Sequence, residues 1–352
     1  MRLWHINEKF LNNIKCNDFI SEMYSKCVIF NLLLSVNVFV VKGGVWMQSD
    51  VYGNDVHHDS KGITFKAVKT LVKDGIIKSN LIPAFAAGFL AVMYHNQSFF
   101  SNVPLLLLMV VATGLVIGGV AALNNYYDRD IDSVMASKQS RPSVDGTFSG
   151  RDILLIGYSF LIIGEILLFS INPTAGTLGL IAAFGYAVVY SIFAKRHLLS
   201  NTIIGAIPGA MPPLIGWAVI DPNLHLLAWA MFVVMFLWQP PHFYALAIRR
   251  SDEYSAAEVP MLPSVKGNHR TRRSIIFWVA LLLFTPIMMT ELGTWFVVMA
   301  TALNIMWLVI SFNRFRPVED DNRHAGKVFI FSLNYIIVFF VMIIVAGLLG
   351  NF

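Results

Sequence analysis

The chain has 352 residues, of which 56% are hydrophobic and only 13% are charged, and its mean hydropathy is +0.64. A soluble domain carries about twice that share of charged residues, so the composition excludes an ordinary soluble protein and predicts an all-α protein that crosses a membrane repeatedly. The net charge of +5 needs no nucleic-acid partner, because Lys and Arg on the cytoplasmic side of a membrane protein account for it. The two cysteines, Cys16 and Cys27, indicate neither a disulfide framework nor a thiolate metal site.

Residues 1–46 differ in composition from the rest of the chain. Their one apolar stretch, residues 27–41, is short for a membrane span, and no clear cleavage site follows it as in a signal peptide. A third interpretation is translated upstream DNA, because the codons before Met47 can form a purine-rich ribosome-binding sequence. We therefore expect an extra N-terminal segment 1–46, a cytoplasmic N-terminus 47–79 and an intramembrane domain 80–352.

Residues 61–78 have an amphipathic pattern. Lys66, Lys69 and Lys73 fall on one helical face, and apolar residues lie on another. We expect an interfacial helix on the cytoplasmic leaflet, with a solvated linker as the alternative.

Nine apolar segments follow, and their loops alternate in charge. The loops after the odd-numbered segments contain no Lys or Arg, whereas those after the even-numbered segments contain several. The positive-inside rule then predicts a bacterial inner-membrane protein with its N-terminus in the cytoplasm and its C-terminus outside. The predicted fold is a membrane helical bundle of about nine transmembrane helices around a central cavity, with spans at 80–95, 103–123, 152–170, 175–194, 202–220, 225–246, 274–290, 294–312 and 328–350.

Three oxygen-bearing side chains, Asn124, Asp128 and Asp132, follow the second predicted span at intervals of four residues. Four residues of helix turn about 400°, so these side chains share one face. Clustered carboxylates repel each other unless a cation compensates, and hard oxygen ligands suit Mg²⁺, with Mn²⁺ as the alternative. The competing interpretation is a solvated, charged helix end.

Basic residues accompany this motif. Arg129, Lys138 and Arg141 belong to the same loop, and Lys195 and Arg196 lie in the next positively charged loop. We expect these side chains to bind diphosphate oxygens, although Lys195 and Arg196 could instead be interface anchors.

A proline pair interrupts the sixth predicted span. Pro240 and Pro241 each remove a backbone donor, so we expect them to break or kink the helix and to aim Gln239 and His242 into the bundle. A lone His in a span is often a packing residue, but ionisable groups within a membrane are commonly functional. Asp252 and Glu253, after this span, form a possible second metal-binding pair.

The motifs as a whole resemble those of the UbiA-type intramembrane aromatic prenyltransferases. Asn-Asn-Tyr-Tyr-Asp-Arg-Asp-Ile-Asp at 124–132, with Ser-Lys-Gln-Ser-Arg-Pro at 137–142, is similar to their first Asp-rich motif. Trp-Gln-Pro-Pro-His-Phe at 238–243 and Pro-Met-Leu-Pro at 260–263 are similar to the family's haem-modifying branch. The resemblance covers nearly all of 62–350, but the second Asp-rich motif of the wider superfamily, a spaced Asp-x-x-x-Asp, is absent.

This resemblance implies a chemistry and a set of site residues. Farnesyl diphosphate would bind through Mg²⁺, and its farnesyl group would pass to a vinyl group of protohaem IX, with His242 ligating the haem iron or donating to a porphyrin edge. The implied partners are the lipid bilayer and a haem A synthase or oxidase-assembly protein. The residues implied are Asn124, Asp128, Asp132, Asp252 and Glu253 for metal; Asn124, Asp128, Asp132, Lys195 and His242 for catalysis; and Trp238, Gln239, His242 and Tyr254 for haem.

Two alternatives remain open from the sequence. One is a prenyltransferase of the same fold that acts on a quinone or chlorophyll precursor. The other is a transporter that uses its intramembrane acids as an ion path. Acids gathered at one membrane face and followed by basic residues fit diphosphate capture better than a path through the midplane. Glu165, inside the third predicted span, has no assigned role.

Overall fold

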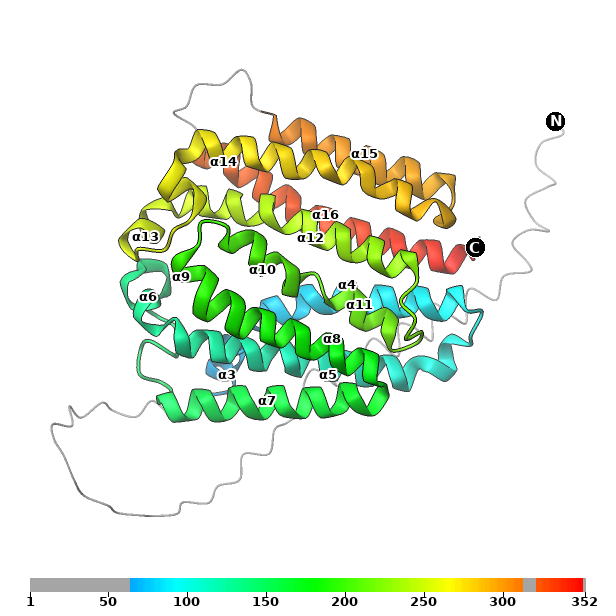
Figure 1. Cartoon of the computed structure of the whole chain (residues 1–352), viewed down its shortest axis with the longest axis horizontal. Helices are drawn as coiled ribbons and strands as arrows, with labels where there is room; N and C mark the ends of the chain where they lie inside the picture. Colours follow the sequence, from blue (N-terminus) through cyan, green and yellow to red (C-terminus); the bar gives the residue numbers. More distant parts are fainter. Residues whose placement is uncertain (1–63, 313–320, 351–352) are drawn as a thin grey trace, which may run out of the picture. The chain divides into compact units, whose positions relative to one another are not determined.

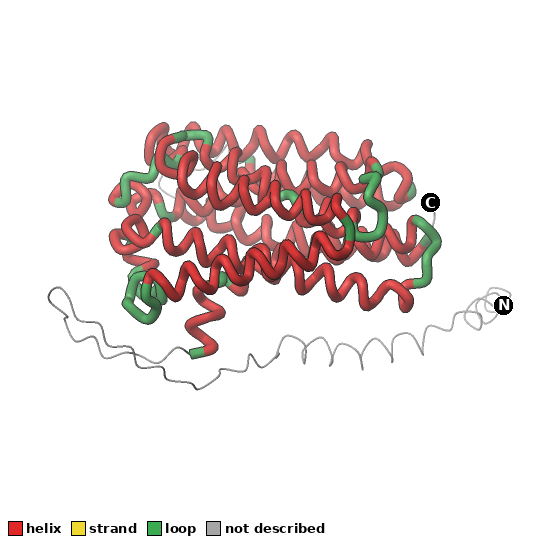
Figure 2. The backbone as a smooth tube through the Cα atoms, turned by 60° about the horizontal axis from the view of Figure 1, so that its bottom comes forward, coloured by secondary structure: helices red, strands yellow, loops and turns green. Residues whose placement is uncertain are grey.

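The computed structural model of the chain describes residues 64–312 and 321–350, and across these two ranges every regular element is a helix. Long helices lie side by side along a common direction in both views of the molecule (Figures 1 and 2). The expected all-α bundle is therefore confirmed for the described residues. The segment 1–46 and the predicted start at Met47 lie outside them.

Among the described residues, eight helical stretches are long and apolar enough to cross a membrane. Two of them join consecutive elements end to end without a loop, three elements in one case and two in the other. They are α4 (Asp74–Tyr94), α5 (Phe99–Tyr127), α7 (Gly150–Ile171), α8 (Pro173–Phe184) with η2 (Gly185–Ala194) and α9 (Lys195–His197), α12 (Leu226–Arg249), α14 (Leu262–Leu281) with η3 (Leu282–Leu292), α15 (Thr294–Ser311) and α16 (Asp321–Leu349).

The predicted span 202–220 occurs as two short helices, α10 (Asn201–Gly209) and α11 (Pro212–Ala218). Pro208 lies near the end of α10, and Pro212 begins α11. Each proline lacks the N–H that would continue a helix, and neither piece alone is long enough to cross a bilayer. The two pieces lie between α8 and α12, where α10 packs on α12 and α11 packs on α4 (Figure 1).

Glycines allow the closest approaches between helices. A Cβ atom added at Gly119 of α5 would lie 2.6 Å from the carbonyl oxygen of Gly157 in α7. One added at Gly216 of α11 would lie 1.9 Å from the carbonyl oxygen of Ala84 in α4. Membrane helices gain most of their association energy from such close backbone packing, because lipid supplies no hydrophobic driving force between them.

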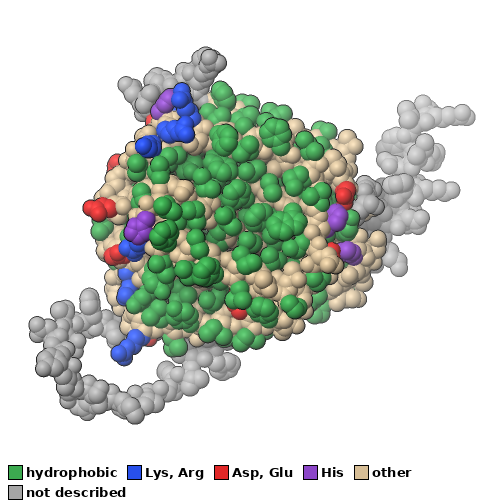
Figure 3. Space-filling view, viewed as in Figure 1, with side chains coloured by type: hydrophobic (Ala, Val, Ile, Leu, Met, Phe, Trp, Pro, Cys, Tyr) green, Lys and Arg blue, Asp and Glu red, His purple; other side chains and the backbone are tan. Residues whose placement is uncertain are grey.

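The surface of the bundle is divided by polarity. Large apolar side chains such as Leu155, Phe284 and Ile287 are 66–69% exposed, as expected for residues that face lipid. In the face that Figure 3 shows, hydrophobic side chains cover the middle of the bundle. Lys and Arg gather at one end, and acidic and His side chains gather mainly at the two ends. This banding matches a bilayer core between two aqueous boundaries.

The expected interfacial helix over 61–78 is wrong in its extent. The structure has a short helix α3 (Phe65–Leu71), capped by the Thr64 hydroxyl, and then starts the first span at Asp74 rather than at residue 80. Lys73 separates the two helices with a φ of +56°, a left-handed conformation that a helix cannot contain. Because of this break, Lys73 does not continue the exposed basic face of α3.

Candidate active site

The Asp-rich motif lies where α5 ends. Asp128 caps this helix, and a new helix, α6 (Arg129–Val134), begins at the next residue. Backbone bonds nevertheless continue across the junction, with Asp128 N–H donating to Asn124 O (2.9 Å) and Asp132 N–H to Asp128 O (2.7 Å). The four-residue spacing therefore keeps its helical geometry, and Asn124, Asp128 and Asp132 are only 3%, 1% and 0% exposed.

Cationic side chains surround these carboxylates. Lys138 Nζ donates to Asp132 Oδ1 at 2.9 Å, and Arg141 Nη1 donates to Asp132 Oδ2 at 2.5 Å. Lys195, from the end of the fourth span, forms an ion pair with Asp128. We call the buried group formed by Asn124, Asp128, Asp132 and their cations the Asp cluster.

Lys73 is the member of the Asp cluster that the sequence analysis missed. Its ammonium group donates to Asn124 Oδ1. Burial, and then the positive charge of Arg141, lower the pKa of Lys73 to about 7. The sequence pattern placed Lys73 with Lys66 and Lys69 on the basic face of an interfacial helix, whereas in the structure Lys73 has a left-handed backbone conformation and contacts Asn124.

The Asp cluster contains more positive than negative charge. Lys73, Lys138, Arg141 and Lys195 would contribute +4 when protonated against −2 from the two carboxylates, which leaves +2. Burial and the neighbouring charge of Lys195 lower the pKa of Lys138, and the nearby cations lower the pKa of Asp132 even though burial opposes its ionisation. An excess of positive charge that is at least partly buried favours binding of a multivalent anion such as a diphosphate.

A π-helical segment completes one wall of the cluster. η2 covers Gly185–Ala194 and places Ser191 opposite Asn124, whose Nδ2 donates to Ser191 Oγ at 3.0 Å. Ser191 Oγ in turn donates to the carbonyl oxygen of Tyr186 at 2.8 Å. π-helical turns are rare and are often found at functional sites. No sequence signal marked Ser191, because nothing in composition or spacing announces a π-helical turn.

Arg129 and Arg196 are oriented away from the cluster. The Arg129 guanidinium lies over the Tyr126 ring, 4.3 Å from its centroid. Arg196 forms a two-pronged ion pair with the exposed Asp130, at 2.7 and 2.8 Å, and its hydrogen bonds lower the pKa of Asp130 to about 2. The structure therefore does not bring these two predicted diphosphate ligands to Asp128 and Asp132.

The expected second metal pair lies on a separate short helix, α13 (Ser251–Ala256). Glu253 accepts hydrogen bonds from the backbone N–H (3.2 Å) and hydroxyl (2.6 Å) of Ser137, and Asp252 is exposed. Tyr254 lies beside Lys138, with its ring centroid 5.9 Å from Nζ. Within 64–312 and 321–350, no group of three or more His, Cys, Asp or Glu side chains is arranged to hold a metal.

One oxygen of the cluster is suited to a metal ion. Asp128 Oδ1 is fully buried, and no described group forms a hydrogen bond with it. An unpaired buried carboxylate oxygen is costly, and a hard cation would satisfy it. Asn124, Asp128 and Asp132 are oxygen donors of the type that Mg²⁺ prefers, and Asp128 Oδ1 is the one among them that no cation of the cluster occupies.

The proline pair does not break the sixth span, but Gln239 and His242 are buried in the bundle as expected, at 5% and 9% exposure. α12 continues from Leu226 to Arg249 through Pro240 and Pro241. Neighbouring helices can stabilise a membrane helix at a proline, because they re-satisfy the freed backbone groups. Gln239 lies against α10, where a Cβ added at Gly209 would come within 2.3 Å of its Oε1. His242 instead contacts α16, and its Nδ1 lies 2.7 Å from Ser332 Oγ.

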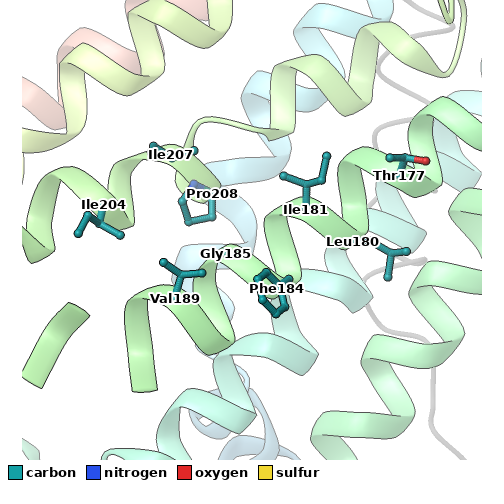
Figure 4. Close-up of a pocket in the computed structure, with 9 residues that line it drawn as sticks. All are labelled: Thr177, Leu180, Ile181, Phe184, Gly185, Val189, Ile204, Ile207 and Pro208. Atoms are coloured by element: carbon teal, nitrogen blue, oxygen red, sulfur yellow. The ribbon is translucent and has the colours of Figure 1, made fainter. Parts of the chain in front are cut away.

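An apolar groove of about 570 Å³ lies between α8, η2 and α10 (Figure 4). Its lining is entirely apolar apart from the Thr177 hydroxyl, and no residue of the Asp cluster lines it. Several of its side chains, including Leu180 and Phe184, are exposed on the outside of the bundle. The groove is thus separate from the polar site.

Known proteins share both the motif and the fold. Residues 80–347 match the model of the UbiA prenyltransferase family. The chain belongs to this family. Its relatives include a protoheme IX farnesyltransferase of Macrococcus caseolyticus, 52% identical over 86% of this chain and 99% of the relative. Another, from Staphylococcus saprophyticus, is 50% identical over 84% of this chain and 97% of the relative.

Solved structures of UbiA proteins resemble the described fold. A digeranylgeranylglyceryl phosphate synthase gives a TM-score of 0.63 at 18% identity, over 80% of this chain and 98% of that one. A UbiA homolog from Archaeoglobus fulgidus bound to GPP and Mg²⁺ gives 0.59 at 17% identity, over 79% of this chain and 99% of that one. These similarities confirm the fold class expected for this prenyltransferase.

Proposed function

We propose that this chain transfers the farnesyl group of farnesyl diphosphate to a vinyl group of protohaem IX, giving haem O and diphosphate. The observation that carries the proposal is the Asp cluster, whose two buried carboxylates lie among four cations. The protoheme IX farnesyltransferases that share about half of its sequence supply the identity of the two substrates.

In this proposal Mg²⁺ is held by Asn124, Asp128 and Asp132. The orphaned Asp128 Oδ1 and the hard-oxygen donor set support this assignment. When bound, the ion supplies Lewis-acid stabilisation of charge on the diphosphate. Asp252 and Glu253, on the separate helix α13, remain proposals for a further ion.

The cations of the Asp cluster bind and stabilise the leaving diphosphate. Lys138, Lys195 and Arg141 already donate to carboxylate oxygens, so they are positioned before substrate arrives. As the allylic C–O bond breaks, negative charge grows on the diphosphate, and fixed cations lower the energy of that charge-separated state. Lys73 adds a fourth donor from the α3–α4 junction.

The bundle also protects the farnesyl cation from premature reaction with water. Asn124, Asp128, Asp132, Lys138 and Lys195 are all less than 10% exposed, so bulk water has little access to the site. The vinyl group attacks the allylic carbon, and a single water then adds to the former vinyl carbon as a hydroxyl and releases a proton. Trp238 and His242 lie on the α12–α16 side of the bundle, which we propose holds the haem.

The distribution of charge supports one orientation in a bacterial inner membrane. The loops that are rich in Lys and Arg contain the Asp-rich motif, α13 and the basic start of α14. We propose that this end is cytoplasmic, that the N-terminus is inside and that the C-terminus is outside.

The test is a product assay in membranes that contain the expressed chain. Haems are extracted, and the expected product has the mass of haem B plus one farnesyl group and one hydroxyl group, with diphosphate released in equal amount. Asp132→Asn should abolish product, because it removes the carboxylate that Lys138 and Arg141 bind. Asp130→Asn is the matched control, since Asp130 is two residues away and exposed. Prenylation of a quinone precursor instead of haem, or no diphosphate release, would overturn the proposal.

A further inference from the structure

The His242 imidazole is enclosed by two aromatic rings. The Trp238 indole stacks on it at 4.6 Å between ring centroids with an interplanar angle of 20°, and the Phe329 ring does so at 4.7 Å and 26°. Two rings that are nearly parallel to one imidazole at these distances occupy its opposite faces. Only the edge of the imidazole, with its two nitrogens, remains for polar contacts.

Ser332 of α16 bonds to all three members of this stack. Its hydroxyl lies 2.7 Å from His242 Nδ1 and 2.6 Å from the carbonyl oxygen of Phe329. Its own carbonyl oxygen accepts the Trp238 Nε1–H at 2.8 Å. The residues that cover the two faces of the imidazole are therefore each tied to the residue that contacts its edge.

These contacts determine which nitrogen of His242 carries the proton. A carbonyl oxygen has no hydrogen, so the 2.6 Å contact between Ser332 Oγ and Phe329 O requires the serine proton. A serine hydroxyl has only one proton, and it must therefore accept from His242 Nδ1–H. In the neutral imidazole, Nε2 is then unprotonated and carries a lone pair. No described group forms a hydrogen bond with Nε2.

We propose that Ser332 is a positioning residue that presents the Nε2 lone pair of His242 as an axial ligand to the iron of protohaem IX. An axial ligand binds through a lone pair in the plane of the ring, so covered ring faces do not hinder it. The fixed tautomer also argues against the alternative that neutral His242 donates a hydrogen bond to a porphyrin edge. This inference rests on the proposed function, because it requires haem as the substrate.

The depth of His242 is consistent with this role. His242 precedes Arg249, at the charged end of α12, by seven residues, or roughly 10 Å at 1.5 Å per residue. The guanidinium of Arg249 lies 5.8 Å from the Phe329 ring, on the same stack. The proposed iron ligand is thus within the apolar part of the bundle, and a cation stands at its polar end.

The test is a titration of the solubilised full-length protein with ferric haem B, followed by the Soret spectrum. Removal of a group that orients a metal-binding histidine typically costs about 10–100-fold in affinity. Ser332→Ala should therefore weaken haem binding by that factor and alter the Soret band, and His242→Ala should remove the histidine-ligated spectrum. Ser332→Thr keeps the hydroxyl and should retain both affinity and spectrum. Asn334→Ala is the matched control, because Asn334 is exposed on α16 and donates to the Ile330 carbonyl oxygen of its own helix.

The outcomes separate the positioning role from packing and from the proposed function. A Ser332→Ala protein that melts earlier but keeps the wild-type Soret band and haem affinity would overturn the inference, as would a His242→Ala protein with an unchanged spectrum. An unchanged spectrum with a shifted pH–rate profile would make His242 a proton acceptor and would also overturn it. Wild-type production of haem O, measured in parallel, shows whether the proposed function stands independently.

Discussion

The ion pair between Asp128 and Lys195 allows a quantitative test of how the Asp cluster is held together. Asp128 is 1% exposed and Lys195 is 8% exposed, so water cannot replace either partner. Asp128→Asn keeps the shape of the side chain but leaves the Lys195 ammonium buried without its counter-charge. Loss of one partner of a buried pair costs about 3–5 kcal/mol. For a chain of this size, that corresponds to a fall in melting temperature on the order of 10 °C.

A double-mutant cycle isolates this interaction. Lys195→Met alone should also destabilise the protein, since it leaves the buried Asp128 carboxylate with a hydrogen bond from Asn124 but without its ion-pair partner. The combination of Asp128→Asn and Lys195→Met should recover most of the loss, because two neutral side chains of similar size need no counter-charge. Thermal unfolding in detergent with excess chelator measures all four proteins without the contribution of a bound metal.

The exposed pair of Asp130 and Arg196 provides the matched control for this cycle. Its side chains are 64% and 30% exposed, so solvent screens their attraction and the coupling should stay below about 1 kcal/mol. If the losses of stability from Asp128→Asn and Lys195→Met simply add in the double variant, the two side chains do not form the ion pair that the structure shows. The net charge assigned to the Asp cluster would then be wrong.

Four further outcomes are expected. Turnover should require Mg²⁺ or Mn²⁺, and full activity in excess chelator would contradict the hard-oxygen site. Lys73→Met should raise KM for farnesyl diphosphate about 10-fold or more through loss of a charged donor, and an unchanged KM would remove Lys73 from the site. Glu165→Leu should raise the melting temperature, because both Glu165 carboxyl oxygens are buried without a hydrogen-bond partner among the described residues, at a cost of about 1–3 kcal/mol. A lower melting temperature would contradict this reasoning. A cysteine at Ser140 should react only with reagents that reach the cytoplasm and one at Asn223 only from outside, and the reverse pattern would invert the topology.

The fold class followed from the sequence because lipid imposes a simple rule on it. A chain in a bilayer must satisfy its backbone hydrogen bonds within each span, so long apolar segments predict helices directly. The same rule says little about where a helix is interrupted. The segment 202–220 is apolar enough to read as one span, yet Pro208 and Pro212 divide it into α10 and α11. Pro240 and Pro241 resemble such a break in sequence, and α12 passes through them.

The candidate site was predictable where its residues are close in sequence. Asn124, Asp128 and Asp132 are related by helical spacing, and Lys138 and Arg141 follow within one loop. The remaining contacts join distant segments through tertiary packing, which no local pattern encodes. Lys73 is 51 residues from Asn124, Ser191 is 67 residues from it, and Ser332 is 90 residues from His242. In the sequence alone, each of these residues can be interpreted as a solvated or packing residue of its local segment.

The sequence separations within the Asp cluster bear on how the protein is made. Asp132 finds both of its cations six and nine residues later, so its charge can be neutralised as soon as that loop leaves the ribosome. Asp128 pairs with Lys195 only later, because Lys195 is 67 residues further along and lies at the end of the second membrane-spanning segment after α5. In a nascent chain that stops before the fourth span, the Asp132 carboxylate is therefore already paired with cations. The Asp128 carboxylate still needs water or a soluble cation. Translation arrested at that point would produce an intermediate that keeps its Asp128 carboxylate near the aqueous boundary until the fourth span is inserted.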